Sequence, residues 1–228
     1  MKDKVTLVTG ASGGLGAFVT RAFLDAGATV IGTSPRIEQS SFSDGNFMAL
    51  RGEITSLQSA TALLDQVASR FGRLDILVHT VGGFAGGKTL ANTDDATFQR
   101  MLEVNLMVTF HVLRAALPLI RKSGSGCIVG IGSRAAVEPG AKVGAYSASK
   151  AAMVSLVRTV AEENKDVGIT ANVILPGTID TPANRKEMPD ADFTKWVQPA
   201  KLAALVVFLA SDAGKDINGA VIPMYGKA

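Results

Sequence analysis

The chain has 228 residues, of which 47% are hydrophobic and 19% are charged, and its formal net charge at pH 7 is +3. This composition is typical of a core-rich folded chain and excludes a disordered polymer. The small net charge and the lack of a basic stripe exclude nucleic acid as the expected partner. The single cysteine excludes an internal disulfide and favours a reducing, cytoplasmic location.

The first residues, MKDKVTLVTG, enter a strand without the apolar core of a signal peptide. The longest apolar stretches, such as 202–210, are shorter than the roughly 20 residues that cross a bilayer, so no membrane span is expected. His79, His111 and Cys127 are interpreted as packing residues. They are too far apart in sequence to show metal-ligand spacing, and we predict no metal.

Short apolar runs alternate with helix-length segments along the chain. Continuously apolar strands are typical of a parallel sheet that is buried on both faces, with helices on each side. The pattern predicts an α/β fold, a single doubly wound Rossmann-type domain over 1–228 with a seven-stranded parallel sheet. The expected strands are 5–9, 29–31, 47–50, 74–78, 126–131, 169–174 and 220–223. The expected helices are 15–26, 56–71, 96–121, 145–164 and 199–209.

Two segments interrupt this rhythm. Residues 33–46 are rich in serine and are expected to be mostly loop. Residues 176–199 carry four prolines between a strand and a helix, and long connections of this kind are commonly binding loops or lids. We therefore place a substrate loop at about 177–198, at the carboxyl edge of the sheet where open α/β folds bind ligands.

The segment TGASGGLG at 9–16 joins the first expected strand to the first expected helix. In this TGxxxGxG spacing, Gly10 permits a tight turn, Gly14 lets the backbone approach a pyrophosphate, and Gly16 lets the helix pack closely. The N–H groups at a helix N-terminus bind anions. A flexible glycine loop is the alternative, but the position between strand and helix favours a dinucleotide site.

Residues after later strands complete the expected cofactor site. Glu53 either accepts a hydrogen bond from the adenine amino group or is a solvated carboxylate. Gly82 and Gly83 either let the backbone pass close to the adenosine or are ordinary loop glycines. The segment 176–178 either fixes the nicotinamide carboxamide or forms a plain Pro-Gly turn.

The end of the second expected strand bears on the choice of cofactor. Ser34 stands where NAD-preferring sites usually carry an acid that binds the ribose 2'-hydroxyl. Thr33 and Ser34 can donate to a 2'-phosphate, and Arg36 can pair with it or point into water. Gly13, in place of a basic residue beside the glycine loop, argues the other way. The sequence predicts a preference for NADPH over NADH.

Four polar residues form the candidate catalytic set. Tyr146 and Lys150 are four residues apart in a helical segment and share one face. An ammonium near the phenol favours the phenolate, which moves the tyrosine pKa from about 10 toward neutrality. Ser133 follows the fifth strand, where its hydroxyl can hold a substrate oxygen. Asn105 lies in an apolar stretch, and a structural tie is the alternative to a catalytic role.

These motifs together resemble the classical short-chain dehydrogenase/reductase family across the whole chain. The resemblance implies that Tyr146 protonates the substrate oxygen, Ser133 orients it and Asn105 supports a water-linked proton path. Lys150 would hold the nicotinamide ribose and tune Tyr146. The full set of implied cofactor residues is Gly10, Ser12, Gly14, Leu15, Gly16, Ser34, Arg36, Glu53, Ile54, Gly82, Tyr146, Lys150, Pro176, Gly177, Thr178, Ile179 and Thr181.

The chain departs from the family pattern at HTVG, residues 79–82, where the family usually has Asn-Asn-Ala-Gly. The roles of those asparagines are therefore not assigned. A narrower resemblance is to dihydropteridine reductase, at GGFAGG over 82–87 and at 180–193. That enzyme lacks the serine and asparagine that this chain has at Ser133 and Asn105, and a complete set suits ordinary ketone reduction.

The sequence therefore predicts an NADPH-dependent reductase of a small ketone, quinone or related conjugated substrate. Reduction of a quinonoid dihydropterin and a non-catalytic dinucleotide-binding scaffold are the alternatives. The family resemblance also implies a homotetramer or homodimer. We expect the long helices to bury outward apolar residues such as Leu113, Ala116 and Leu117 in a twofold-related partner.

Overall fold

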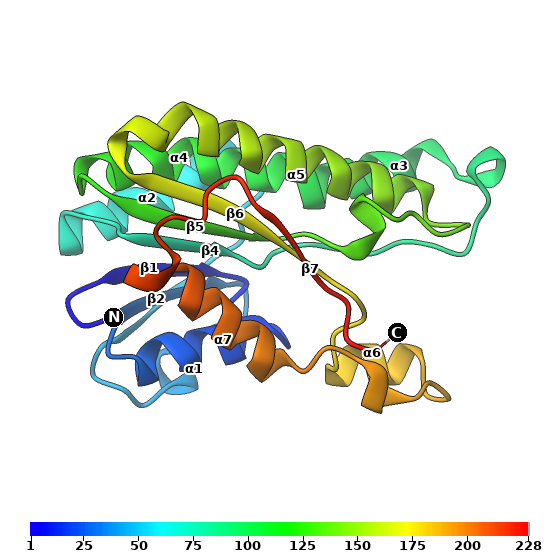
Figure 1. The fold of residues 1–228 in the computed structure, drawn as a ribbon, viewed down its shortest axis with the longest axis horizontal. Coiled ribbons are helices and arrows are strands. Elements are labelled where there is room, and N and C mark those ends of the chain that lie inside the picture. The colour runs from blue at the N-terminus through cyan, green and yellow to red at the C-terminus, as the bar shows by residue number, and fades with distance from the viewer. Residues whose placement is uncertain (228) are drawn as a thin grey trace.

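The computed structural model describes residues 1–227 and is built around a seven-stranded parallel sheet in the order β3-β2-β1-β4-β5-β6-β7 (Figure 1). The strands are β1 (Val5–Thr9), β2 (Thr29–Ser34), β3 (Phe47–Arg51), β4 (Ile76–His79), β5 (Gly126–Ile131), β6 (Ile169–Pro176) and β7 (Val221–Met224). The helices are α1 (Gly16–Asp25), α2 (Leu57–Phe71), α3 (Asp95–Leu102), α4 (Val108–Lys122), α5 (Gly144–Asn164), α6 (Pro182–Glu187) and α7 (Pro199–Leu209). The predicted fold class is confirmed.

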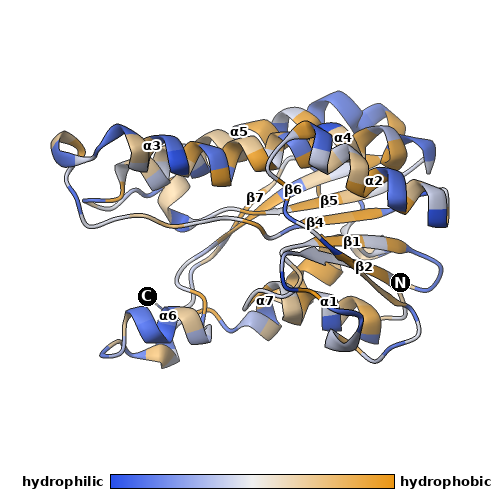
Figure 2. Cartoon of the chain, turned by 180° about the vertical axis from the view of Figure 1, so that it is seen from behind, coloured by the Kyte–Doolittle hydropathy of each residue, from blue (hydrophilic) through white to orange (hydrophobic). Residues whose placement is uncertain are grey.

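The sheet is covered on both faces. Helices α2, α4 and α5 lie on one face, and α1 and α7 lie on the other (Figure 1). Successive residues of β1 face opposite sides, so Leu7 belongs to the first hydrophobic core and Val8 to the second. Both side chains are fully buried. Figure 2 shows the apolar strands between the two helical layers, which is why these strands are continuously hydrophobic in sequence.

The predicted helix 96–121 is interrupted. Between α3 and α4 the chain makes a π-helical turn, Glu103–Met107, that contains Asn105. The Thr109 hydroxyl donates to the Asn105 carbonyl oxygen at 2.7 Å, and the Asn105 side chain bonds to the loop after β4. Hydrophobic periodicity does not reveal one extra residue in a turn, because the flanking helices continue in nearly the same direction.

The stretch Asp95–Lys122 is the one described helix that is long and apolar enough to cross a membrane by length and composition. This helix is longer than the apolar stretch 202–210, which was named from the sequence as an example of the longest apolar stretches. Its residues Val112, Leu113 and Ala116 are buried in the core over the sheet. Packing inside the protein therefore accounts for its apolar composition.

Candidate active site

The glycine loop joins the carboxyl end of β1 to α1. Gly10 has φ +74°, and a Cβ there would lie 2.6 Å from the Thr80 hydroxyl oxygen. A Cβ on Gly16 would collide with the Gly10 carbonyl oxygen. Leu15 is the N-cap residue of α1, and its side chain makes no hydrogen bond to the N–H groups of the first turn. The first turn of α1 therefore offers N–H groups to an anion, as a pyrophosphate site requires.

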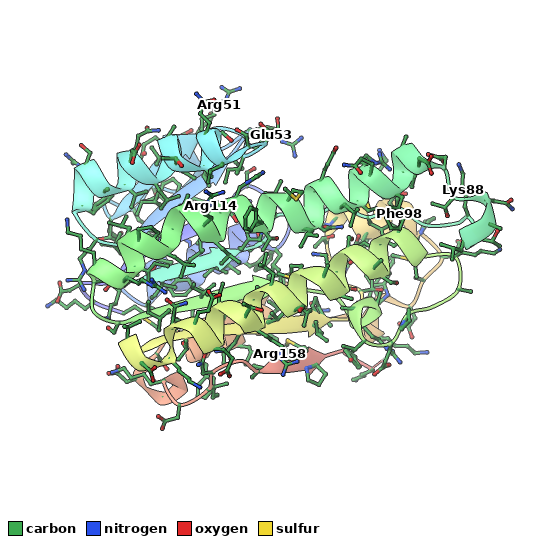
Figure 3. The ribbon with its side chains drawn as sticks, turned by 90° about the horizontal axis from the view of Figure 1, so that it is seen from above. Arg51, Glu53, Lys88, Phe98, Arg114 and Arg158 are labelled. Carbon is green, nitrogen blue, oxygen red and sulfur yellow. The ribbon has the colours of Figure 1, made fainter. Side chains whose placement is uncertain are left out.

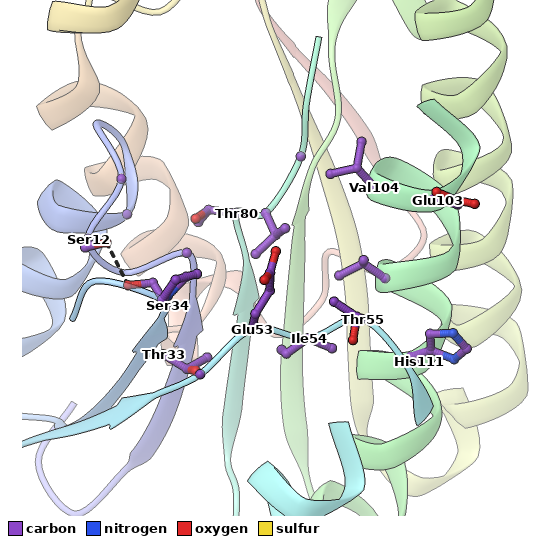
Figure 4. Close-up of a pocket in the computed structure, with 18 of the residues that line it drawn as sticks. Ser12, Thr33, Ser34, Glu53, Ile54, Thr55, Thr80, Glu103, Val104 and His111 are labelled. Carbon is purple, nitrogen blue, oxygen red and sulfur yellow. Dashed lines mark hydrogen bonds between the residues drawn. The ribbon is translucent and has the colours of Figure 1, made fainter. Parts of the chain in front are cut away.

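A cavity of about 880 Å³ opens at this loop, between the ends of β1 to β4 and the α3–α4 region (Figure 4). Ser34 donates to the Ser12 hydroxyl oxygen at 2.7 Å inside it. Thr33 Oγ1 and His111 Nδ1 line the same region and are buried without a hydrogen-bond partner in the described residues. The predicted cofactor residues in the lining are Gly10, Ser12, Gly14, Leu15, Gly16, Ser34, Glu53, Ile54 and Gly82.

These features fit a dinucleotide. The lining combines a cavity of about 880 Å³ with glycines where a Cβ has no room and with the hydroxyls of Ser12 and Ser34. No group of three or more potential metal ligands occurs within residues 1–227.

The predicted residues after β6 lie outside this cavity lining. Thr178 accepts a hydrogen bond from the Val197 N–H at 2.8 Å, and Ile179 forms a parallel bridge with Val197. Thr181 caps α6, and a Cβ on Gly14 would lie 2.8 Å from its methyl group. The loop after β6 therefore packs directly against the glycine loop. Pro176 is buried, and a Cβ on Gly177 would lie 2.6 Å from the Tyr225 carbonyl oxygen.

Arg36 is also outside the cavity lining. Its side chain is exposed and makes no hydrogen bond or ion pair with any residue in 1–227. The pairing with a phosphate that the sequence suggested is therefore neither preformed nor blocked.

Asn105 connects the π-helical turn to the loop after β4 and to α5. Its side chain is 1% exposed. The amide nitrogen donates to the Gly83 carbonyl and to Ser149 Oγ, both at 3.0 Å, and its oxygen accepts from the Gly83 N–H at 2.9 Å. Ser149 in turn donates to the Tyr146 carbonyl oxygen at 2.7 Å. The structural tie weighed from the sequence is thus present, and it ends at the helix that carries Tyr146.

Tyr146, Ser133 and Lys150 meet at the ends of β5 and α5. Burial raises the pKa of Tyr146, and a hydrogen bond with the Ser133 side chain lowers it in part. Lys150 donates to the Ile131 carbonyl oxygen at 3.0 Å, and burial lowers its pKa to about 8. Desolvation of the phenol, rather than the lysine charge expected from the sequence, is the larger influence on Tyr146. The phenol is therefore in its acid form at neutral pH.

Gly82 lies between Asn105 and Lys150. A Cβ at this position would lie 2.9 Å from both Asn105 Oδ1 and Lys150 Nζ. The sequence interpretation gave Gly82 a role beside the adenosine. Its lack of a side chain also permits the close approach of the asparagine and the lysine, and that requirement is visible only in three dimensions.

The departure from Asn-Asn-Ala-Gly has a structural account. His79 is 1% exposed, its Nδ1 lies 2.8 Å from the Thr9 hydroxyl oxygen, and burial lowers its pKa to about 3. Thr80 donates its hydroxyl to the Thr9 carbonyl oxygen at 2.7 Å. The neutral imidazole and the hydroxyl thus tie the end of β4 to the end of β1. His79 is thus a buried core residue, and its Nδ1 has a hydrogen-bond partner. Its Nε2 has no partner within residues 1–227.

Two residues near the centre were missed from the sequence. Ser149 relays Asn105 to α5, and its position three residues after Tyr146 on a helix was the available signal. Phe84 is 67% exposed, and its ring lies edge-on to that of Tyr146 with centroids 5.0 Å apart. The run 82–87, which contains Phe84, was singled out by its resemblance to dihydropteridine reductase, but no contact between Phe84 and Tyr146 was predicted.

A dinucleotide-sized cavity beside a protonated, partly buried tyrosine and a buried lysine defines a class of protein, the doubly wound NAD(P)-dependent oxidoreductases. The sequence model described as short chain dehydrogenase matches residues 4–192. The chain belongs to this family.

Named relatives agree with this assignment. The 7alpha-hydroxysteroid dehydrogenase of Escherichia coli is 31% identical over 242 residues, covering 99% of this chain and 94% of that protein. D-beta-hydroxybutyrate dehydrogenase of Rhizobium meliloti is 29% identical over 98% of this chain and 97% of its own length. Among solved structures, ElxO with NADP bound superposes with a TM-score of 0.91 and 27% identity, covering 99% of this chain and 98% of that one.

Proposed function

We propose that the chain is an NADPH-dependent reductase of a small ketone, quinone or related conjugated substrate, with Tyr146 as the general acid. The observation that carries this proposal is the partly buried Tyr146 phenol, which is hydrogen-bonded with Ser133. Burial raises its pKa further above its ordinary value of 10, so it holds a proton at neutral pH. When bound, the nicotinamide supplies the hydride. Tyr146 donates its proton to the substrate oxygen, Ser133 orients that oxygen, and Lys150 holds the nicotinamide ribose.

The surroundings of Tyr146 support an apolar, planar substrate. Phe84, whose ring contacts that of Tyr146, is 67% exposed. A Cβ on Gly86 would lie 2.8 Å from the tip of the Phe84 ring and 3.2 Å from Val143. An exposed aromatic ring beside the proton donor can cover one side of a conjugated substrate. The substrate loop at about 177–198 belongs to this proposal and would cover the other side.

The preference for NADPH is supported by the end of β2. Ser34 and Ser12 present hydroxyls to the cavity where an acid would repel a 2'-phosphate. The similar structure ElxO is described with NADP bound. Ser34→Asp is expected to lower kcat/KM for NADPH more than for NADH. A wild-type enzyme that uses NADH more efficiently would contradict the preference.

A cytoplasmic location and a homodimer or homotetramer are part of the same proposal. The single thiol, Cys127, is buried, and the outer surface of α4 carries the exposed apolar residue Phe110. Burying such side chains in a partner is favourable.

The proposal is tested by NADPH oxidation with a panel of ketones, quinones and quinonoid dihydropterin. Tyr146→Phe should reduce turnover at least about 100-fold while NADPH binding stays within about twofold, because a positioned acid contributes on that scale. Turnover of the pterin alone would favour the dihydropteridine-reductase alternative. No turnover of any member, with NADPH still bound, would favour a scaffold. Near-normal turnover by Tyr146→Phe would exclude Tyr146 as the acid.

A further inference from the structure

A second arginine lies beside the part of the cavity where the ribose 2'-position is expected. Like Arg36, Arg51 is outside the cavity lining, but the lining residues Gly52 and Glu53 follow it directly. Arg51 is the last residue of β3, and Ser34 is the last residue of β2. The two are direct partners in the parallel ladder between these strands. Neighbouring strands are about 4.8 Å apart, so Arg51 begins one strand away from Ser34.

The side chains of Ser34 and Arg51 leave the sheet on the same face. Side chains alternate along a strand, and paired residues of neighbouring strands point to the same side. Val30 and Phe47, an earlier pair of the same ladder, are both buried in the core on the α1 side. Ser34, four residues after Val30, points the same way and reaches Ser12 in the glycine loop. The alternation gives Arg51 the same direction.

The guanidinium of Arg51 is held over the loop that follows β2. Its Nε donates to the Pro35 carbonyl oxygen at 2.9 Å, and Pro35 lines the cavity next to Ser34. Its terminal nitrogens Nη1 and Nη2 make no hydrogen bond or ion pair within residues 1–227. Figure 3 shows Arg51 beside Glu53, a cavity-lining residue. The Arg51 guanidinium is therefore oriented by one contact with the backbone, and its two terminal nitrogens remain as donors for an anion.

We infer that Arg51 is a specificity-determining residue that binds the 2'-phosphate of NADPH together with the Ser12 and Ser34 hydroxyls. This inference rests on the proposed NADPH preference. Arg36, which the sequence suggested for this role, has no contact that fixes its orientation, whereas the Pro35 carbonyl fixes that of Arg51. An oriented guanidinium binds phosphate through charge-assisted hydrogen bonds and loses less conformational freedom on binding.

The competing role is purely structural. If Arg51 only clamps the Pro35 carbonyl, its loss disturbs the loop after β2 and weakens every adenosine ligand alike. If it binds the 2'-phosphate, its loss weakens only ligands that carry this group. The ratio of two affinities separates these roles.

The test is calorimetric titration of adenosine 2',5'-bisphosphate and 5'-AMP into wild type, Arg51→Gln and Arg70→Gln, the last an exposed arginine on α2 as control. We expect the wild type to favour the bisphosphate and Arg51→Gln to lower that preference about tenfold or more, with 5'-AMP affinity unchanged within twofold. Arg70→Gln should keep the wild-type preference. Arg51→Lys, which keeps the charge but not the fork, should show a smaller loss and serves if Arg51→Gln does not fold.

Equal weakening of both ligands in Arg51→Gln would overturn the role of Arg51 and leave the cofactor proposal standing. A wild-type protein that does not favour the bisphosphate would overturn both. An unchanged preference in Arg51→Gln and Arg51→Lys would assign the 2'-phosphate to the serines and Arg36 alone.

Discussion

Burial controls the charge state of the titratable residues around the reacting centre. It raises the pKa of Tyr146, lowers that of Lys150 to about 8, and lowers that of His79 to about 3. Each shift favours the neutral form, because a charge in a low-dielectric interior loses hydration. Tyr146 therefore keeps its proton at neutral pH, as the general acid of the proposed function must.

His79 should make the protein sensitive to acid. Unfolded His79 binds a proton below its ordinary pKa of 6.5, whereas the folded residue stays neutral until about pH 3. Between these values the unfolded chain binds more protons, so the free energy of unfolding should fall by up to about 1.4 kcal/mol per pH unit as the pH decreases. Urea unfolding at pH 6.5, 5.5 and 4.5 measures this slope.

His79→Asn is the matched variant, since an amide can replace the Thr9 contact but does not titrate. Its slope over the same pH range should be shallower than that of the wild type. Identical slopes would mean that other groups cause the acid sensitivity.

The loop after β6 is fixed at its base and less connected at its tip. Asp180 accepts two hydrogen bonds from Arg185, at 2.6 and 2.8 Å, and one from Gln198 at 3.1 Å. The rings of Phe193 and Trp196 are in tilted contact, with centroids 4.8 Å apart. The bond between Asp180 and Gln198 joins the two ends of the proposed lid, so its motion is expected to centre on 182–195.

Hydrogen exchange should reveal this motion. In the free protein, backbone amides of 182–195 should exchange faster than those of 176–181, because most of their contacts are local and exposed. Addition of NADPH and a substrate analogue should slow exchange in 182–195, while α2, on the far side of the sheet, stays unchanged. Equal exchange of 182–195 with and without ligands would contradict a lid.

The outer surface of α4 differs from the one expected from the sequence. Leu113 and Ala116 are 2% and 0% exposed and face the sheet of their own chain, so the prediction that they face a partner is wrong. Leu117 is only partly buried. Phe110 is 36% exposed, and the Arg114 guanidinium lies 5.9 Å from its ring centroid. Arg114 lies on the outer side of α4 (Figure 3). These are the side chains available to a partner.

A homodimer or homotetramer should therefore depend on Phe110. Phe110→Glu places a charge in the proposed interface and should shift the mass measured by light scattering at micromolar concentration to a smaller species. Gln66→Glu, an exposed change on α2, should keep the wild-type mass. A monomeric wild type would reject the assembly, and an unchanged mass for Phe110→Glu would place the interface elsewhere.

The sequence by itself determined the parallel sheet, the glycine loop, and the helix that carries Tyr146 and Lys150, because these depend on local periodicity and fixed short spacings. Tertiary structure alone decided the π-helical turn at Asn105, the burial that raises the pKa of Tyr146, and the contacts of Gly82, Phe84 and Arg51. Each of these depends on segments far apart in the chain that meet only when the sheet forms. These distant neighbours set the desolvation of a side chain and the register between strands, and neither can be read from the local sequence pattern.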